Sequence, residues 1–275
     1  MSKFGTLYVE SDSFFNKMEP SLKLLIFVLW SITVFMFLDI RVVAFLLCLG
    51  VVCLCFSKIP FRIIKNLFIV VIIFNLINAA FIFLITPEYG TTLTGKTTVL
   101  LSLLGYKLTL ETLFYIITLS LKYISLLPIA MILIFTTHPS RFAASLNKVG
   151  IPYKIAYTFN IIFRYIPDIQ NEFKTIAHAQ AARGLSFGKD EKSFSKRVRN
   201  LFNITIPLIN SALNRIDNVT NAMDLRGFGK HNKRTWYNAT VFDKSDYIVL
   251  VISIAVFIFF IWFRIGNGIK FWYPF

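Results

Sequence analysis

The sequence predicts an all-α polytopic membrane protein, with about five transmembrane helices and a cytoplasmic module of long amphipathic helices. Hydrophobic residues make up 56% of the 275 residues, and 30 residues are Phe. This apolar excess is too large for an ordinary soluble domain. Apolar runs of bilayer length recur along the chain, and one long basic segment separates the last run from the others.

Five apolar runs are interpreted as membrane spans, because a helix needs ~20 mostly apolar residues to cross the hydrocarbon core. The second run is short and fits if Asp39 and Arg41 lie at the interface. We therefore expect a membrane region with four spans at 1–136, a cytoplasmic module at 137–245, and the last span with an aromatic tail at 246–275. The five runs are about Leu22–Leu38, Val42–Phe56, Leu67–Thr86, Leu108–Thr136 and Tyr247–Phe263.

The charge distribution predicts the orientation. Residues 138–245 hold 17 of the 29 Lys/Arg and seven of the 14 Asp/Glu, and the turn at Ser57–Asn66 is also basic. Basic loops favour the cytoplasmic side of a membrane. A nucleic-acid patch is the other reading of a basic segment, but no nucleic-acid-binding motif is found and the charges are dispersed. We expect the N-terminus inside and the C-terminus outside, although Arg264 and Lys270 argue weakly against the latter.

A phosphate-binding motif is matched at Gly90–Thr97, "GTTLTGKT", but we reject it. It falls between two spans on the side expected to face outward, and no strand–helix framework follows it. Cys48, Cys53 and Cys55 are expected to act as small apolar residues in a span. The three His are scattered, and no nucleophile stands beside a base. We therefore predict no catalytic residue, no metal site and no cofactor.

Three polar residues interrupt the apolar spans. Asn75 and Asn78 share one helical face and are expected to form interhelical hydrogen bonds rather than to bind a substrate. Lys122 lies in mid-span, and a lysine there is a functional-site hypothesis by default. Glu111 is too far along the helix, at roughly 16 Å, to pair with it directly. We expect Lys122 to face the protein interior or to extend toward the interface.

The basic module is predicted to consist of helices separated by proline and glycine. A short helix is bounded by Pro139 and Gly150, and later helices are expected to be interrupted at Pro167 and at Pro207. Between them, "LSFGKDEKSFSKRVRN" is expected to be a linker. The two stretches that follow the internal prolines are amphipathic, and each is about 24–28 Å long. Their apolar faces begin one residue before each proline and comprise Ile166, Ile169, Phe173 and Ile176 in the first, and Ile206, Ile209, Leu213 and Ile216 in the second.

Both amphipathic stretches end in Arg-Gly, at Arg183-Gly184 and at Arg226-Gly227. Glycine after a helix end supplies the left-handed cap, and a cation in the last turn suits the negative pole of the helix. Small residues crowd the first end, and such residues let helices approach closely. If the helices cross near these ends, both arginines project from one face and can form bidentate bonds with partner carboxylates.

At this point the chain resembles a known family, over nearly its whole length. It is similar to the transmembrane T component of energy-coupling factor (ECF) transporters, within the cobalt-transport Q-type family. The segment from "TTHPSRFAASLNKVG" to "AHAQAARG" carries the strongest likeness, and "AMDLRGFG" with "KRTWY" carries the second. Near the start, "MEPSLKL" fills the slot of the family's Leu-Asp-Pro-Arg-x-Lys-Leu, with three departures. "LLGYKLTLETL" resembles the family's entry to span four.

The resemblance implies that Ala182, Arg183 and Gly184, and likewise Leu225, Arg226 and Gly227, are motifs that bind ATPase subunits. Leu225 departs from the family's Ala, which puts in doubt how closely the helices pack there. It implies a non-catalytic subunit in the plasma membrane of a prokaryote. Its partners are two cytoplasmic ATP-binding subunits, expected as a heterodimer, one or several substrate-binding S subunits for vitamins or other micronutrients, and the bilayer, but no nucleic acid. A self-contained channel or carrier is the alternative, and a membrane-embedded enzyme is a further rival.

Overall fold

The computed structural model describes residues 8–87, 89–95, 97–103, 106–185, 194–231, 235–237, 239–267 and 272–274. Contacts divide the chain into two compact units. The first, which we call the bundle unit, holds residues 8–138 together with 240–275. The second, the helix-pair unit, holds residues 139–239.

All five predicted spans are helices of the bundle unit, and the prediction of an all-α polytopic membrane protein is confirmed. Helices α4, α6 and α10 are long and apolar enough to cross a membrane, whereas α2 and α3 have 17 residues each. Two short helices, α1 (Phe14–Lys17) and α5 (Tyr89–Thr94), complete the described helices of this unit. The five long helices are α2 (Pro20–Met36), α3 (Ile40–Phe56), α4 (Phe61–Ile85), α6 (Leu110–Thr136) and α10 (Lys244–Asn267).

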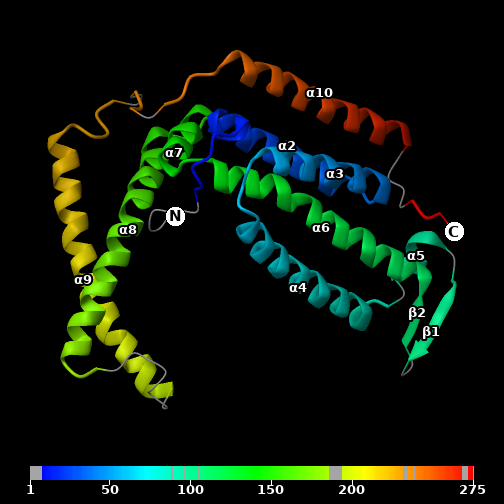
Figure 1. Cartoon of the computed structure of the whole chain (residues 1–275), viewed down its shortest axis with the longest axis horizontal. Helices are drawn as coiled ribbons and strands as arrows, with labels where there is room; N and C mark the ends of the chain where they lie inside the picture. The colour runs from blue at the N-terminus through cyan, green and yellow to red at the C-terminus, as the bar shows by residue number, and fades with distance from the viewer. Residues whose placement is uncertain are drawn as a thin grey trace. The chain divides into compact units, whose positions relative to one another are not determined.

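Helix α6 is the centre of the bundle unit, with α3 and α4 on either side of it (Figure 1). Between α3 and α6 the backbones come close at Gly50, where an added Cβ would lie 3.2 Å from the Cβ of Pro128. Trp30 of α2 closes the same region by donating from Nε1 to the Ser125 carbonyl at 3.1 Å. Because lipid tails are as apolar as Leu, such close packing and internal hydrogen bonds hold membrane helices together.

A two-stranded antiparallel hairpin precedes α6, and the sequence analysis did not predict it. Strand β1 (Val99–Leu103) pairs with β2 (Tyr106–Thr109), with Val99 opposite Thr109. The predicted start of span four, at Leu108, is therefore two residues early. Thr109 is the N-cap of α6, and its Oγ1 accepts a hydrogen bond from the Thr112 amide. A capping threonine ends the strand and begins the helix at one residue.

The helix-pair unit contains α7 (Pro139–Lys148), α8 (Tyr153–Ala182) and α9 (Phe194–Leu225). The short helix expected between Pro139 and Gly150 is confirmed. The expected interruptions at Pro167 and Pro207 are wrong, because α8 and α9 continue through both prolines. Proline removes one hydrogen bond from a helix, and a helix of 30 or more residues keeps its remaining bonds on both sides.

The expected basic linker is shorter than predicted. Its last seven residues, from Phe194 to Asn200, form the first turns of α9. Residues 186–193 of the predicted linker lie outside the described part of the chain.

Candidate functional site

Helices α8 and α9 end with the same backbone geometry. At the end of α8, the Leu185 amide donates to the Gln180 carbonyl at 3.1 Å, and the Gly184 amide donates to Ala181 at 2.9 Å. This 6→1 and 5→2 pair, with Gly184 at φ +87°, is a Schellman motif. It places Arg183 at the C-cap, the last residue before the chain turns away.

The end of α9 repeats this arrangement. The Phe228 amide donates to Met223 and the Gly227 amide to Asp224, each at 2.9 Å, and Gly227 has φ +67°. Arg226 therefore occupies the position that Arg183 occupies on α8. The predicted left-handed glycine caps are confirmed at both sites.

The end of α7 has the same backbone geometry but a different residue at the C-cap. There the Ile151 amide donates to Leu146 at 3.1 Å, the Gly150 amide donates to Asn147 at 3.2 Å, and Gly150 has φ +106°. The cap residue before this glycine is Val149. The Schellman motif is thus a general way of ending helices in this unit, and the C-cap arginine is what α8 and α9 add to it.

Apart from Gly227, which is partly buried, the motif residues are exposed at both ends. Ala182, Arg183 and Gly184 are exposed, and so is Arg226. Leu225 is 90% exposed, so it does not pack between the two helices. The Leu225 side chain therefore makes little contact with either helix of the pair.

Contacts along α8 and α9 show that the two helices are antiparallel. Gln180, near the end of α8, donates from Nε2 to the Asn203 carbonyl, near the start of α9, at 3.3 Å. Farther along, Glu172 accepts hydrogen bonds from Ser211 and Arg215. The Arg215 guanidinium also lies 5.6 Å from the ring centroid of Tyr165. Residue numbers rise on one helix as they fall on the other.

This antiparallel pairing corrects the expectation that the helices cross near their arginine ends. None of these contacts joins the two arginine ends to each other, and Arg183 and Arg226 lie at opposite ends of the pair. The run of small residues does not form the crossing either, since Ala179, Ala181 and Ala182 are exposed. Charged and amide side chains, Glu172, Arg215 and Gln180, hold the helices together instead.

An aromatic cluster anchors the Arg226 end, and the sequence analysis did not identify it. Phe228, two residues after Arg226, has its ring centroid 4.9 Å from Tyr157 and 5.7 Å from Tyr153, both at the start of α8. Trp236 contacts the same two tyrosines and donates from Nε1 to Asn147 of α7 at 3.2 Å. The cluster of Tyr153, Tyr157, Phe228 and Trp236 thus ties the end of α9 to α7 and α8. The sequence signal that could have predicted this cluster is the presence of four aromatic residues in the helix-pair unit.

Two polar residues of the membrane spans, Lys122 and Asn75, donate hydrogen bonds to backbone carbonyls of the bundle unit. Lys122 is 7% exposed and donates to the Phe35 carbonyl in the last turn of α2 at 3.2 Å, so the expectation that it faces the interior is confirmed. Asn75 donates to Val71 of its own helix at 2.8 Å, so the expected interhelical bond of its amide group is wrong. A buried asparagine amide can be satisfied by the carbonyl one turn earlier.

The phosphate-motif lookalike has the wrong structure for nucleotide binding. Residues Gly90 to Thr94 belong to α5, whereas a phosphate-binding loop wraps its free amides around the phosphate. Gly90 packs against α6, because an added Cβ would lie 2.3 Å from the Thr112 amide nitrogen. Lys96 lies outside the described residues. Within the described ranges, no group of three or more His, Cys, Asp or Glu could hold a metal ion.

Comparison with known proteins places these features in a family. The sequence model described as "CbiQ: Cobalt transport protein" matches residues 11–237. The chain is 24% identical over 268 residues to an energy-coupling factor transporter transmembrane protein EcfT from Lactococcus lactis subsp. cremoris, covering 94% of this chain and 97% of that protein. It is 26% identical to the protein of that name from Clostridium kluyveri, with 95% and 96% covered. Identity to the Brevibacillus brevis protein is 36% over 156 residues, covering 54% of this chain and 58% of that protein.

Proposed function

This chain belongs to the CbiQ family, as a transmembrane component of energy-coupling factor transporters, and we propose that it links two cytoplasmic ATPases to a substrate-binding S subunit. In this role the chain is non-catalytic, and its partners hydrolyse ATP. The helix-pair unit lies in the cytoplasm of a prokaryotic cell, with the N-terminus inside and the C-terminus outside the plasma membrane. The cargo is a vitamin or another micronutrient, held by the S subunit.

The placement of the two arginines supports two ATPase partners. Arg183 and Arg226 cap antiparallel helices, so two equivalent motifs point away from opposite ends of one pair. Each guanidinium can form two parallel hydrogen bonds with one carboxylate, which makes arginine suited to a fixed docking geometry. Two similar ATPase subunits, as a heterodimer, would each receive one end. This repeated cap is the observation that carries the proposal.

An exposed apolar stripe on α9 supports a further protein partner. Ile206, Ile209, Leu213 and Ile216 are each more than half exposed, although they share one helical face. An apolar stripe of this length on a solvent-exposed helix marks an interaction site. We assign it to one or several S subunits, whose movement the helix pair would follow.

The alternative is a self-contained channel or carrier that uses Lys122 as a gate or ion site. The contact of Lys122 with the Phe35 carbonyl argues against this, because the ammonium group is already bonded to the end of α2. A membrane-embedded enzyme would need a nucleophile, base or metal set, and the residues that the structure describes bring no such set together.

The proposal is tested by reversing both charges in one chain. Arg183→Glu with Arg226→Glu is expected to abolish co-purification of the ATPase pair from native membranes while the protein stays in the membrane. A matched control is Arg164→Glu with Arg199→Glu, which changes two exposed arginines on the same helices. Normal vitamin uptake by the first variant, or the absence of any ATPase pair with the wild-type protein, would overturn the coupling role.

A further inference from the structure

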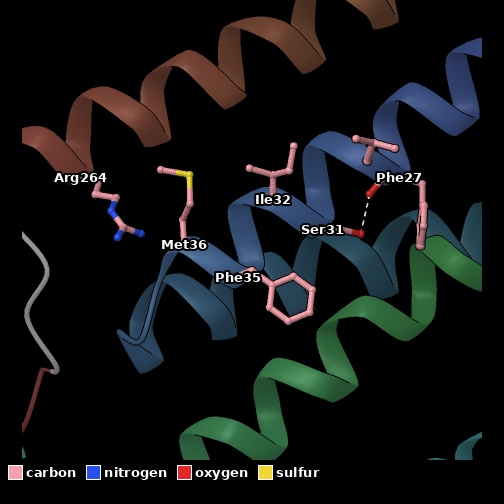
Figure 2. Close-up of a pocket in the computed structure, with 7 residues that line it drawn as sticks. Phe27, Ser31, Ile32, Phe35, Met36 and Arg264 are labelled. Carbon is pink, nitrogen blue, oxygen red and sulfur yellow. Dashed lines mark hydrogen bonds between the residues drawn. The ribbon is translucent and has the colours of Figure 1, made fainter. Parts of the chain in front are cut away.

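A shallow groove of about 510 Å³ lies between α2 and α10 of the bundle unit (Figure 2). One wall is a face of α2 that runs from Phe27 to Met36, about 13 Å at the rise of an α-helix. Apart from the Ser31 hydroxyl, which donates to the Phe27 carbonyl, this wall presents apolar side chains. The groove is long, its α2 wall is almost entirely apolar, and it is open to the surroundings.

Arg264 of α10 is the charged residue that lines this groove. Figure 2 shows its side chain extending from α10 toward α2, beside Met36. Its Nη1 atom is buried and has no hydrogen-bond partner among the residues that the structure describes. The guanidinium also lies 5.9 Å from the ring centroid of Phe37. A guanidinium donor left without an acceptor is costly, and no carboxylate among the described residues pairs with Arg264, so its charge favours an anion in the groove that it lines.

The surrounding charges also favour an anion at this position. Lys122 lies 5.4 Å from the ring centroid of Phe35, which also lines the groove, and adds a second positive charge there. The acid nearest in the sequence to the end of α2 is Asp39, and its carboxylate pairs with Arg41 at 3.3 Å. The end of α2 therefore has a local excess of positive charge beside an apolar wall.

The depth of Arg264 matches a lipid headgroup. It lies in the last turn of α10, at the end of the bundle unit where Arg41 stacks on Trp272 at 4.1 Å. Tryptophan and arginine are typical of the membrane–water interface. From that level the groove descends along Ile32 and Val28, which are 43% and 44% exposed. An occupant needs an anionic group at the interface and an apolar chain below it.

We propose that this groove binds one anionic phospholipid, with its phosphodiester on Arg264 and an acyl chain along α2. Arginine binds phosphate oxygens through two parallel hydrogen bonds, and the apolar wall accepts the chain. A partner subunit could place a carboxylate on Arg264. The continuous apolar wall of about 13 Å, lined by one cationic residue and no acid, fits a lipid better.

Lipid binding is measured by native mass spectrometry of the full chain purified in detergent. Phosphatidylglycerol and phosphatidylcholine with the same acyl chains are added in turn. The wild type is expected to retain one phosphatidylglycerol in preference to phosphatidylcholine. Arg264→Gln is expected to weaken that binding about tenfold, since a hydrogen bond to a charged group is lost. Arg41→Gln is the matched control, because that arginine lies at the same end and already has a carboxylate partner.

A second variant tests the groove without touching the charge. Ile32→Trp fills the apolar wall and is expected to lower phosphatidylglycerol retention with Arg264 intact. Equal retention by wild type, Arg264→Gln and Ile32→Trp overturns the proposal. So does tight binding of glycerophosphoglycerol, which lacks acyl chains and would show a site for free phosphodiesters. Loss of S-subunit or ATPase co-purification in Arg264→Gln, with lipid retention unchanged, would show a protein interface instead.

Discussion

Lys23 and Lys122 cap each other's helices. Lys23, in the first turn of α2, donates to the Thr136 carbonyl at the end of α6 at 2.9 Å. Lys122, in the middle of α6, donates to the Phe35 carbonyl at the end of α2 at 3.2 Å. Both side chains are buried. Each ammonium therefore satisfies a terminal carbonyl and lies at the negative pole of the other helix.

Replacing Lys122 by Met is expected to destabilise the bundle unit without abolishing transport. The Phe35 carbonyl would lose its donor, which costs about 1–2 kcal/mol. Thermal unfolding in detergent should show a lower midpoint temperature, while vitamin uptake persists. Lys65→Met, at an exposed position on α4, is the control and should leave the midpoint unchanged. Loss of uptake by Lys122→Met with an intact complex would instead indicate a direct role in transport.

Single substitutions compare the two arginine motifs. Because Arg183 and Arg226 occupy the same cap position, replacing either by Ala is expected to weaken ATPase binding by a similar amount, about 1.5–3 kcal/mol. Affinity can be measured with the purified chain and the ATPase pair. Arg164→Ala, an exposed arginine within α8, should have little effect. A loss confined to one arginine would show that the two ends dock differently.

The cap glycines test whether backbone geometry aims the arginines. Gly184→Ala forces a side chain into φ +87°, at a cost of about 1 kcal/mol, although open space surrounds the position. We expect weaker ATPase binding at unchanged charge. Gly150→Ala is a matched control, because Gly150 closes the same motif on α7, next to Val149 rather than an arginine. Its destabilisation should be similar and its ATPase affinity normal; equal affinity loss in both variants would contradict the aiming role.

The aromatic cluster should matter for Arg226 alone. Phe228→Ala removes the ring that contacts Tyr153 and Tyr157, and is expected to cost roughly 2 kcal/mol at this partly buried site. Hydrogen exchange should rise at the end of α9 and the start of α8, and binding through Arg226 should weaken. Phe202→Ala, at a residue of α9 that is 58% exposed, is the control. Unchanged exchange in Phe228→Ala would show that the cluster does not anchor this end.

Local signals in the sequence were sufficient for the membrane helices and for the caps. Long apolar runs predict spans because bilayer thickness sets their length, and Arg-Gly predicts a helix end because glycine tolerates positive φ. The internal prolines led to a wrong prediction because a proline is also only a local signal. Proline weakens one turn, but Pro167 and Pro207 lie within helices of 30 and 32 residues that continue past them.

Long-range contacts were the part that the sequence could not supply. The antiparallel pairing depends on Glu172 meeting Arg215, 43 residues later, and periodicity contains no information on that pairing. The partner of Lys122 lies 87 residues earlier, in α2. The hairpin before α6 was missed because the residues of β2 were assigned to the entry of span four.

Helices α2 and α3 have a consequence for the bilayer itself. With 17 residues each they measure about 25 Å, some 5 Å less than an ordinary hydrocarbon core. Hydrophobic mismatch of this kind is relieved by thinning of the adjacent leaflets, at a fraction of a kcal/mol per Å. If α2 and α3 each cross the bilayer, we expect the membrane beside them to be thinner than elsewhere and to favour lipids with shorter acyl chains.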